Sequence, residues 1–210
     1  MIKIEKVHAY GWEAAIRGMR NPLNSWDRMD SKFGDEFELG SNDLDLMLRL
    51  NKAGTDHAKF MRMIMVSMDI TAPLYWWKEY DTYKVGTVAN SCSTMHKVHS
   101  RDLTIKDFSY EHLNSSSRTL LSMIINEMNT NRRKYIRDKN NKEHWWQIIQ
   151  LLPTSYNQKR TVLVNYAVLQ KMYHARKNHK LDEWQSFCTV IKTLPYANEL
   201  IIGRELDADA

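Results

Sequence analysis

The chain has 210 residues, of which 43% are hydrophobic and 26% charged, with only seven glycines and four prolines. This composition excludes a disordered chain and disfavours a turn-rich sandwich, so it indicates a globular protein built from long regular elements. The formal net charge is +5, but Asn131–Lys142 contains six basic residues and one acid and so accounts for all of it. An Asn-rich basic run of this kind is usually a solvated connection, and a polynucleotide site there is our least favoured interpretation.

The N-terminal sequence alternates charged and apolar residues and lacks the apolar core of a signal peptide. No stretch approaches the roughly 18 uncharged apolar residues of a membrane-spanning helix. Cys92 and Cys188 show no paired spacing, which favours a reducing compartment, and we expect a cytoplasmic protein. The histidines form no HxxxH or HExxH pair, so we predict no metal site. No GxSxG, GxGxxG or Walker-type loop is present, which disfavours the commonest hydrolases, dinucleotide folds and NTPases.

Helix and strand signals follow one another in the first half of the chain. Four acidic residues of a polar stretch are interpreted as a surface loop: Asp27, Asp30, Asp35 and Glu36. Ser41 predicts a capped helix start, with stop signals at Lys52 and Gly54. Every second residue from Phe60 to Ile70 is mostly apolar, which predicts a strand. Because proline is tolerated in a first helical turn, a further helix is expected to begin at Pro73.

Four apolar stripes at helical spacing predict four helices in the second half of the chain. The first two are Leu121, Ile124, Ile125 and Met128, and then Trp146, Ile149 and Leu152, closed by Pro153. The last two are Val162, Tyr166, Leu169 and Tyr173, and then Trp184, Phe187, Cys188 and Ile191, which end near Pro195. With one or two early strands, these helices predict a helix-rich α+β protein.

Ile70–His96 has an unusual composition, with two tryptophans, three tyrosines, Lys78, Lys84 and a run of hydroxyl residues. Aromatic faces beside cations suit planar heteroaromatic ligands, and hydroxyls in a glycine-containing loop suit phosphate oxygens. The segment is therefore a candidate nucleotide or cofactor pocket. The alternative is that Trp76 and Trp77 are core or subunit-interface residues, and composition alone leaves both open.

A second candidate group lies between Pro153 and Trp184. Asn165 and Arg176 are eleven residues apart, about three helical turns, which predicts that both project from one helix face. Lys159 is expected just before this helix. An amide and a guanidinium on one face can bind a base edge and a phosphate, although the spacing alone favours an exposed polar stripe.

Together these features resemble the flavin-dependent thymidylate synthase family. Ala72–Tyr80 resembles the helix that has an Ala-Pro start and a later Arg-Gln-Trp in that family. The series Pro153, Asn165, Arg176 and Trp184 resembles the family's C-terminal pattern in order and nearly in spacing. Looser similarity extends to Ala15–Lys32 and Leu44–Gly54, so the resemblance covers most of the chain.

The resemblance implies a single α+β domain over residues 1–210, helix-rich and with a small antiparallel sheet. It also implies a homotetramer with FAD at subunit junctions, which methylates dUMP with methylenetetrahydrofolate and NADPH and without a cysteine nucleophile. In such an enzyme the flavin carries the redox chemistry, while the protein supplies orientation and electrostatics.

Site residues follow from the resemblance position by position, and none of them is assigned as catalytic. The residues assigned to the cofactor are Tyr83, Lys84, Asn90 and Asn165. The residues assigned to the pyrimidine nucleotide are Lys78, Glu79, Thr87, Ser91, Lys159 and Arg176.

One departure from the family pattern concerns the Arg-His-Arg signature, which here reads Thr82-Tyr83-Lys84. The loss of two or three cations should cost several kcal/mol, at roughly 1.5–3 kcal/mol per charged hydrogen bond. Either the pocket is rebuilt by stacking on Trp76, Trp77 and Tyr83, or the family reaction is lost. The sequence thus predicts a divergent enzyme that methylates dUMP or a related nucleotide. The alternative is a non-catalytic nucleotide-binding protein that keeps the fold and oligomer.

Overall fold

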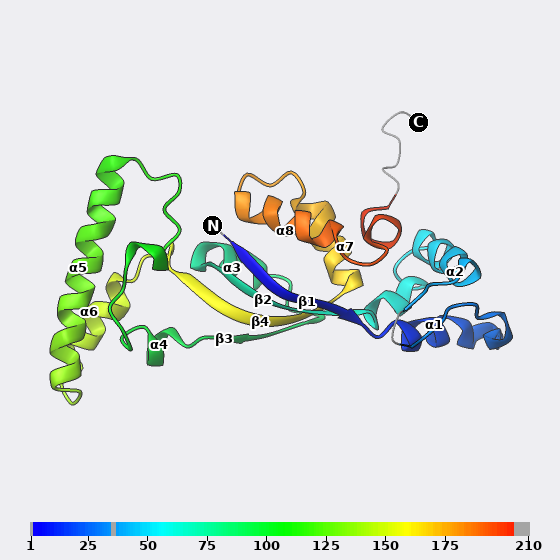
Figure 1. Ribbon diagram of the computed structural model, residues 1–210, viewed down its shortest axis with the longest axis horizontal. Coiled ribbons are helices and arrows are strands. Elements are labelled where there is room, and N and C mark those ends of the chain that lie inside the picture. Colours follow the sequence, from blue (N-terminus) through cyan, green and yellow to red (C-terminus); the bar gives the residue numbers. More distant parts are fainter. Residues whose placement is uncertain (1, 35–36, 204–210) are drawn as a thin grey trace. The chain divides into compact units, whose positions relative to one another are not determined.

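The computed structural model describes residues 2–34 and 37–203, which form an α+β fold rich in helices (Figure 1). Its antiparallel sheet has the strand order β1-β2-β4-β3. The strands are β1 (Lys3–Tyr10), β2 (Met65–Pro73), β3 (Thr87–Ser91) and β4 (Asn157–Asn165). The fold class predicted from the sequence is therefore confirmed.

Eight α-helices are found among the described residues, together with several short helical turns. They are α1 (Trp12–Arg20), α2 (Ser41–Lys52), α3 (Leu74–Tyr80), α4 (Thr94–Lys97), α5 (Ser115–Arg137), α6 (Glu143–Leu151), α7 (Tyr166–Arg176) and α8 (Asp182–Lys192). The short turns are η1 (Asn21–Leu23), η2 (Trp26–Arg28), η3 (Ala58–Arg62), η4 (Ile105–Asp107) and η5 (Asn198–Ile202).

The described residues form two compact units. The first holds residues 2–3, 70–82 and 90–161, and the second holds residues 4–34, 37–69, 83–89 and 162–203. Each strand of the sheet contributes residues to both units. A single domain over residues 1–210 stays a prediction.

The first unit contains a helical hairpin of α5 and α6, which lie side by side in Figure 1. Leu121, Ile125 and Met128 of α5 are buried against Ile148 of α6, so the stripe predicted for α5 is confirmed. The stripe predicted for α6 is wrong at Trp146, which is 47% exposed. Trp146 and Ile148 are two residues apart, about 200° around a helix, so they face opposite sides.

The strand predicted over residues 60–70 begins later than expected. Residues Ala58–Arg62 form the turn η3, and β2 runs from Met65 to Pro73. Pro73 ends the strand with extended backbone and α3 begins at Leu74, one residue after the predicted start. Both the strand and the following helix were therefore predicted, but not their boundary.

The helix predicted from Val162 is also displaced, because β4 continues to Asn165 and α7 begins only at Tyr166. The run Thr161-Val162-Leu163-Val164 is rich in β-branched residues, which favour a strand. The predicted apolar stripe of α8, from Trp184 to Ile191, is fully confirmed by burial.

In the second unit, α2 spans the predicted helix, but its N-terminus is capped by Asp30 rather than by Ser41. The Asp30 carboxylate accepts hydrogen bonds from the backbone N–H groups of Asn42, at 2.9 Å, and Asp43, at 3.0 Å. Burial opposes ionisation here, but these hydrogen bonds outweigh it and lower the pKa of Asp30 below its ordinary value. The interpretation of Asp30 as a plain surface loop residue is corrected, while Asp35 and Glu36 lie outside the described residues.

Asp43 lies at the centre of a buried polar network behind this cap. Its carboxylate accepts from Arg20 Nε at 2.7 Å, from Ser31 Oγ at 2.6 Å, and from the backbone N–H groups of Ser31 and Asp30. Arg20 Nη2 lies 2.6 Å from the same carboxylate. The network joins the end of α1 to the start of α2.

Candidate functional site

Arg176, the last residue of α7, lies against two aromatic rings of the second unit. Its Nε donates to the Tyr83 hydroxyl at 3.0 Å, and its guanidinium carbon is 4.9 Å from the Trp184 ring centroid. A guanidinium held over aromatic faces has a fixed orientation. The structure thus brings together Tyr83 and Arg176, which the sequence placed in two separate candidate groups.

At the other end of α7, Asn165 is the helix N-cap. Its side-chain oxygen accepts from the backbone N–H of Val168 at 3.0 Å, and the residue is buried. Asn165 precedes the helix, so the prediction that it shares a helix face with Arg176 is wrong. Its assignment to a cofactor stays a prediction.

Gly86 lies directly beside this cap. Its φ of +85° is in the region that favours glycine, and an added Cβ would lie 2.8 Å from Asn165 Nδ2. Residues 83–86 therefore run back along α7, from Arg176 at its last turn to Asn165 at its first.

This close approach predicts a measurable coupling between the two positions. Asn165→Ala is expected to lower the free energy of unfolding by about 1 kcal/mol, because a helix cap is lost. Gly86→Ala is expected to cost more in the wild type than in the Asn165→Ala variant, where the amide that the methyl group meets is absent. Urea unfolding of the four proteins measures the coupling, and strictly additive costs would contradict the proposed contact.

Two threonine hydroxyl groups close to Gly86 in the sequence form hydrogen bonds within the chain. Thr82 Oγ1 donates to the Glu79 carbonyl at 2.7 Å, and Thr87 Oγ1 donates to the Tyr83 carbonyl. Lys84, in contrast, is exposed and keeps its ammonium group at the surface. An ammonium group is a donor that suits a phosphate oxygen.

The other predicted site residues lie in the first unit. Lys78 and Glu79 belong to α3, Asn90 and Ser91 end β3 and are exposed, and Lys159 is half-buried on β4. Lys159 was expected just before a helix, but its strand position follows from the later start of α7. The structure therefore places Tyr83, Lys84, Thr87, Asn165 and Arg176 in one unit and the remaining five in the other.

Trp76 and Trp77 are fully buried core residues of the first unit. The Trp77 indole N–H donates to the Gln158 carbonyl at 2.9 Å, and Arg160 lies over the Trp77 ring at 4.2 Å. Arg160 also pairs with Asp81 at 2.7 Å. The suggestion that Trp76 and Trp77 rebuild a ligand-stacking surface is therefore wrong, and the core interpretation of these two residues is correct.

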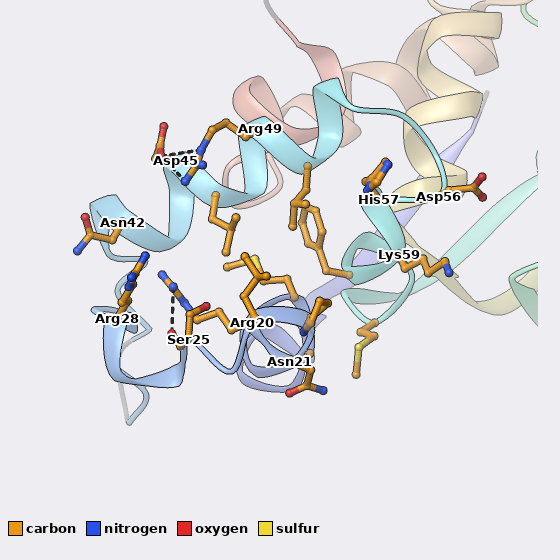
Figure 2. A pocket seen from close by; sticks show the side chains of 18 residues that line it. Arg20, Asn21, Ser25, Arg28, Asn42, Asp45, Arg49, Asp56, His57 and Lys59 are labelled. Atoms are coloured by element: carbon orange, nitrogen blue, oxygen red, sulfur yellow. Dashed lines mark hydrogen bonds and ion pairs between the residues drawn. The ribbon is translucent and has the colours of Figure 1, made fainter.

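A pocket of about 820 Å³ in the second unit was missed by sequence reasoning (Figure 2). Residues of α1, α2, η3 and the segment after α1 line it, and none of the ten predicted site residues is among them. Its charged lining residues are Arg20, Arg28, Asp45, Arg49, Asp56 and Lys59. These residues form no spacing motif, and only the pairing of α1 with α2 brings them together.

Other chemistries have less support in the part of the chain that the structure describes. No group of three or more His, Cys, Asp or Glu residues could hold a metal ion there. Burial raises the pKa of the Cys188 thiol to about 11, which makes it a poor nucleophile, while Cys92 is exposed. None of the described helices has the length and apolar character needed to cross a membrane.

The sequence matches no family model and no curated protein. The structure, in contrast, is similar to thymidylate synthase X (ThyX) from Helicobacter pylori with FAD and dUMP, with a TM-score of 0.68, 16% identity, and coverage of 96% of this chain and 97% of that one. The fold is ThyX-like. A second H. pylori ThyX complex with FAD and dUMP gives a TM-score of 0.66 at 16% identity, covering 94% of this chain and 98% of that one.

A UMP/dUMP methylase, PolB from Streptomyces cacaoi, bound with 5-Br dUMP, is also similar. Its TM-score is 0.61 at 13% identity, covering 92% of this chain and 89% of that one. The similarity to ThyX and PolB extends over nearly the whole chain. At such low identity it shows the shared fold, and the resemblance seen in the sequence is confirmed at that level.

Proposed function

We propose that this chain is a divergent ThyX-like enzyme that binds dUMP or a related pyrimidine nucleoside monophosphate and methylates it. The observation that carries the proposal is the position of Arg176, held by Tyr83 and Trp184 in a ThyX-like fold. The three similar structures hold dUMP or its 5-bromo analogue, which supports this class of ligand.

In this proposal the cationic residues bind the nucleotide through their charge, and the other assigned residues orient it through hydrogen bonds. Arg176 offers a bidentate fork to a phosphate or a uracil carbonyl, while Lys78 and Lys159 offer point charges. Glu79, Thr87 and Ser91 are assigned hydrogen bonds to the nucleotide in the same proposal. The homotetramer implied by the resemblance remains part of the proposal, and light scattering tests it.

The residues assigned to FAD have suitable donor chemistry. The Lys84 ammonium is exposed and suits the pyrophosphate, Tyr83 offers a half-buried ring, and the amides of Asn90 and Asn165 suit a flavin edge. Bound FAD, once reduced by NADPH, would supply the hydride that takes the one-carbon unit transferred from methylenetetrahydrofolate to a methyl group. The chain itself would bind and orient these groups.

The alternative is a nucleotide-binding protein without flavin chemistry, and two observations favour it. Trp76 and Trp77 are closed inside the core, and Lys84 is the only cation of Thr82-Tyr83-Lys84. Both hypotheses predict that the protein binds a pyrimidine nucleotide, and only the first predicts that it also binds FAD.

The test combines colour with nucleotide binding. The enzyme is expected to carry or take up stoichiometric FAD, with absorbance at about 450 nm, a property of the flavin itself. Saturating dUMP, at about 100 times Kd, should stabilise the native state by about 2.7 kcal/mol in a thermal-shift titration.

Arg176→Ala should weaken dUMP binding by roughly tenfold or more, because a charged hydrogen bond is lost. Lys177→Ala, the neighbouring exposed cation, is the matched control and should leave the affinity unchanged. A colourless protein that cannot take up FAD but binds dUMP would select the alternative. No dUMP binding at all would reject both hypotheses.

A further inference from the structure

The pocket of the second unit lies between α1, α2 and η3, and its two ends differ in chemistry (Figure 2). In this view Arg20, Ser25, Arg28 and Asn42 lie toward one end, and Asp56, His57 and Lys59 lie at the other. Its volume of about 820 Å³ is in the range of small-molecule sites.

Arg20 lines this pocket from a buried position, since it is only 4% exposed. Its guanidinium donates through Nε to Asp43 and through Nη1 to the Ser25 carbonyl, and Nη2 forms an ion pair with the same carboxylate. A guanidinium has five N–H donors, and these three contacts leave two of them without a partner among residues 2–34 and 37–203. Buried donors normally find an acceptor, so these two N–H groups can donate to an oxygen atom of a ligand that enters the pocket.

Arg28 adds a second cation at the same end. The Ser25 carbonyl accepts from the backbone N–H of Arg28 at 3.2 Å and from Arg20 Nη1 at 3.2 Å, so one carbonyl links the two arginines. The Arg28 side chain is exposed, and no acid within the described ranges pairs with it.

The acidic groups around this end are already engaged. Asp43 is bound by Arg20 and Ser31, Asp30 caps α2, and Asp45 pairs with Arg49 at 2.9 Å. Asp27 belongs to the same turn as Arg28 but does not line the pocket. Because Asp30 already occupies the N-terminus of α2, an incoming anion would meet the arginine side chains instead.

The pocket also has an apolar lining. Met19, Leu46, Leu50, Phe60 and Met63 contribute to it. Cationic and apolar side chains in one pocket suit a ligand with an oxyanion head and an apolar or heteroaromatic body.

We propose that this pocket binds an organic phosphomonoester, with the phosphate at Arg20 and Arg28 and the organic body over Leu46 and Met19. A phosphate offers three terminal acceptor oxygens, which can engage both guanidinium groups at once. This site shares no residue with the proposed nucleotide site and does not depend on it.

The test uses phenyl phosphate, inorganic phosphate and phenol as probes, so that head and body are measured separately. Arg28→Gln removes the exposed cation without disturbing the buried pair, and Lys52→Gln removes an exposed cation of α2 that does not line the pocket. We expect phenyl phosphate to bind the wild type more tightly than inorganic phosphate does in calorimetry, with amide NMR shifts at residues 20, 28 and 42. Phenol is expected not to bind measurably.

Arg28→Gln should weaken phenyl phosphate binding at least tenfold, whereas Lys52→Gln should change it less than twofold. The proposal would be overturned if Arg28→Gln left the affinity for phenyl phosphate unchanged or if both variants lost it equally. It would also be overturned if the wild type bound no phenyl phosphate up to about 10 mM. Arg176→Ala separates the two sites, because phenyl phosphate binding should survive in that variant even where dUMP binding is lost. Its loss in Arg176→Ala would also overturn the assignment to this pocket.

Discussion

Asp43→Ala is expected to lower the free energy of unfolding by about 3–5 kcal/mol, the usual cost of removing one partner of a buried ion pair. Asp43 is fully buried, and its carboxylate accepts from Arg20, from the Ser31 hydroxyl and from two backbone N–H groups. Alanine would leave the Arg20 guanidinium buried without its counter-charge. Urea unfolding followed by circular dichroism measures the loss.

Two variants make this result specific to the buried pair. Asp45 follows Asp43 by two positions in α2 and forms an exposed ion pair with Arg49. Asp45→Ala breaks this pair and should cost no more than about 1 kcal/mol. The double variant Asp43→Leu with Arg20→Met removes both charges and should be less destabilised than Asp43→Ala. Equal costs for Asp43→Ala and Asp45→Ala would contradict the network described for α1 and α2.

Trp77→Ala is the second change with a large expected effect, about 3–5 kcal/mol of unfolding free energy, because it empties a fully buried indole site. Trp77→Phe retains much of the volume but removes the N–H that donates to the Gln158 carbonyl, and should cost about 1–3 kcal/mol. Trp146→Ala is the control, since that indole is 47% exposed, and is expected to cost less than about 1 kcal/mol.

The same series distinguishes a core residue from a ligand-stacking residue. A core Trp77 predicts a loss of stability in proportion to the volume removed. A stacking Trp77 predicts a stable protein with weakened FAD or dUMP binding. Full stability of Trp77→Ala in thermal and urea unfolding would therefore contradict the core assignment.

The parts of the fold that were predicted from sequence are those controlled by local periodicity. The stripes of α5 and α8 are correct because each helix buries one face against a single core. The boundary between β4 and α7 was missed because Val162 and Tyr166 also fit a helical spacing, while the sheet pairing that selects a strand comes from distant residues.

In the candidate site, too, the contacts that were not predicted join residues far apart in the sequence. That Arg176 and Tyr83 touch could not be read from spacing, because they are 93 positions apart and meet only through the packing of residues 83–86 along α7. The role of Asp30 as a cap was hidden for a similar reason, since the helix that it caps begins eleven residues later. The burial of Trp76 and Trp77 required the β4 strand, which supplies the Gln158 carbonyl.

Because residues 83–86 contact both ends of α7, the length of this helix sets the distance between the two contacts. Gly86 fixes the segment at Asn165, and Tyr83 meets Arg176 eleven residues further on. One residue inserted in α7 would keep the first contact but move the Arg176 guanidinium by about 1.5 Å along the axis and 100° around it, away from Tyr83. The length of this helix is therefore as much a determinant of the site as the identity of its residues, and comparisons with ThyX-like chains should align the number of turns before the side chains.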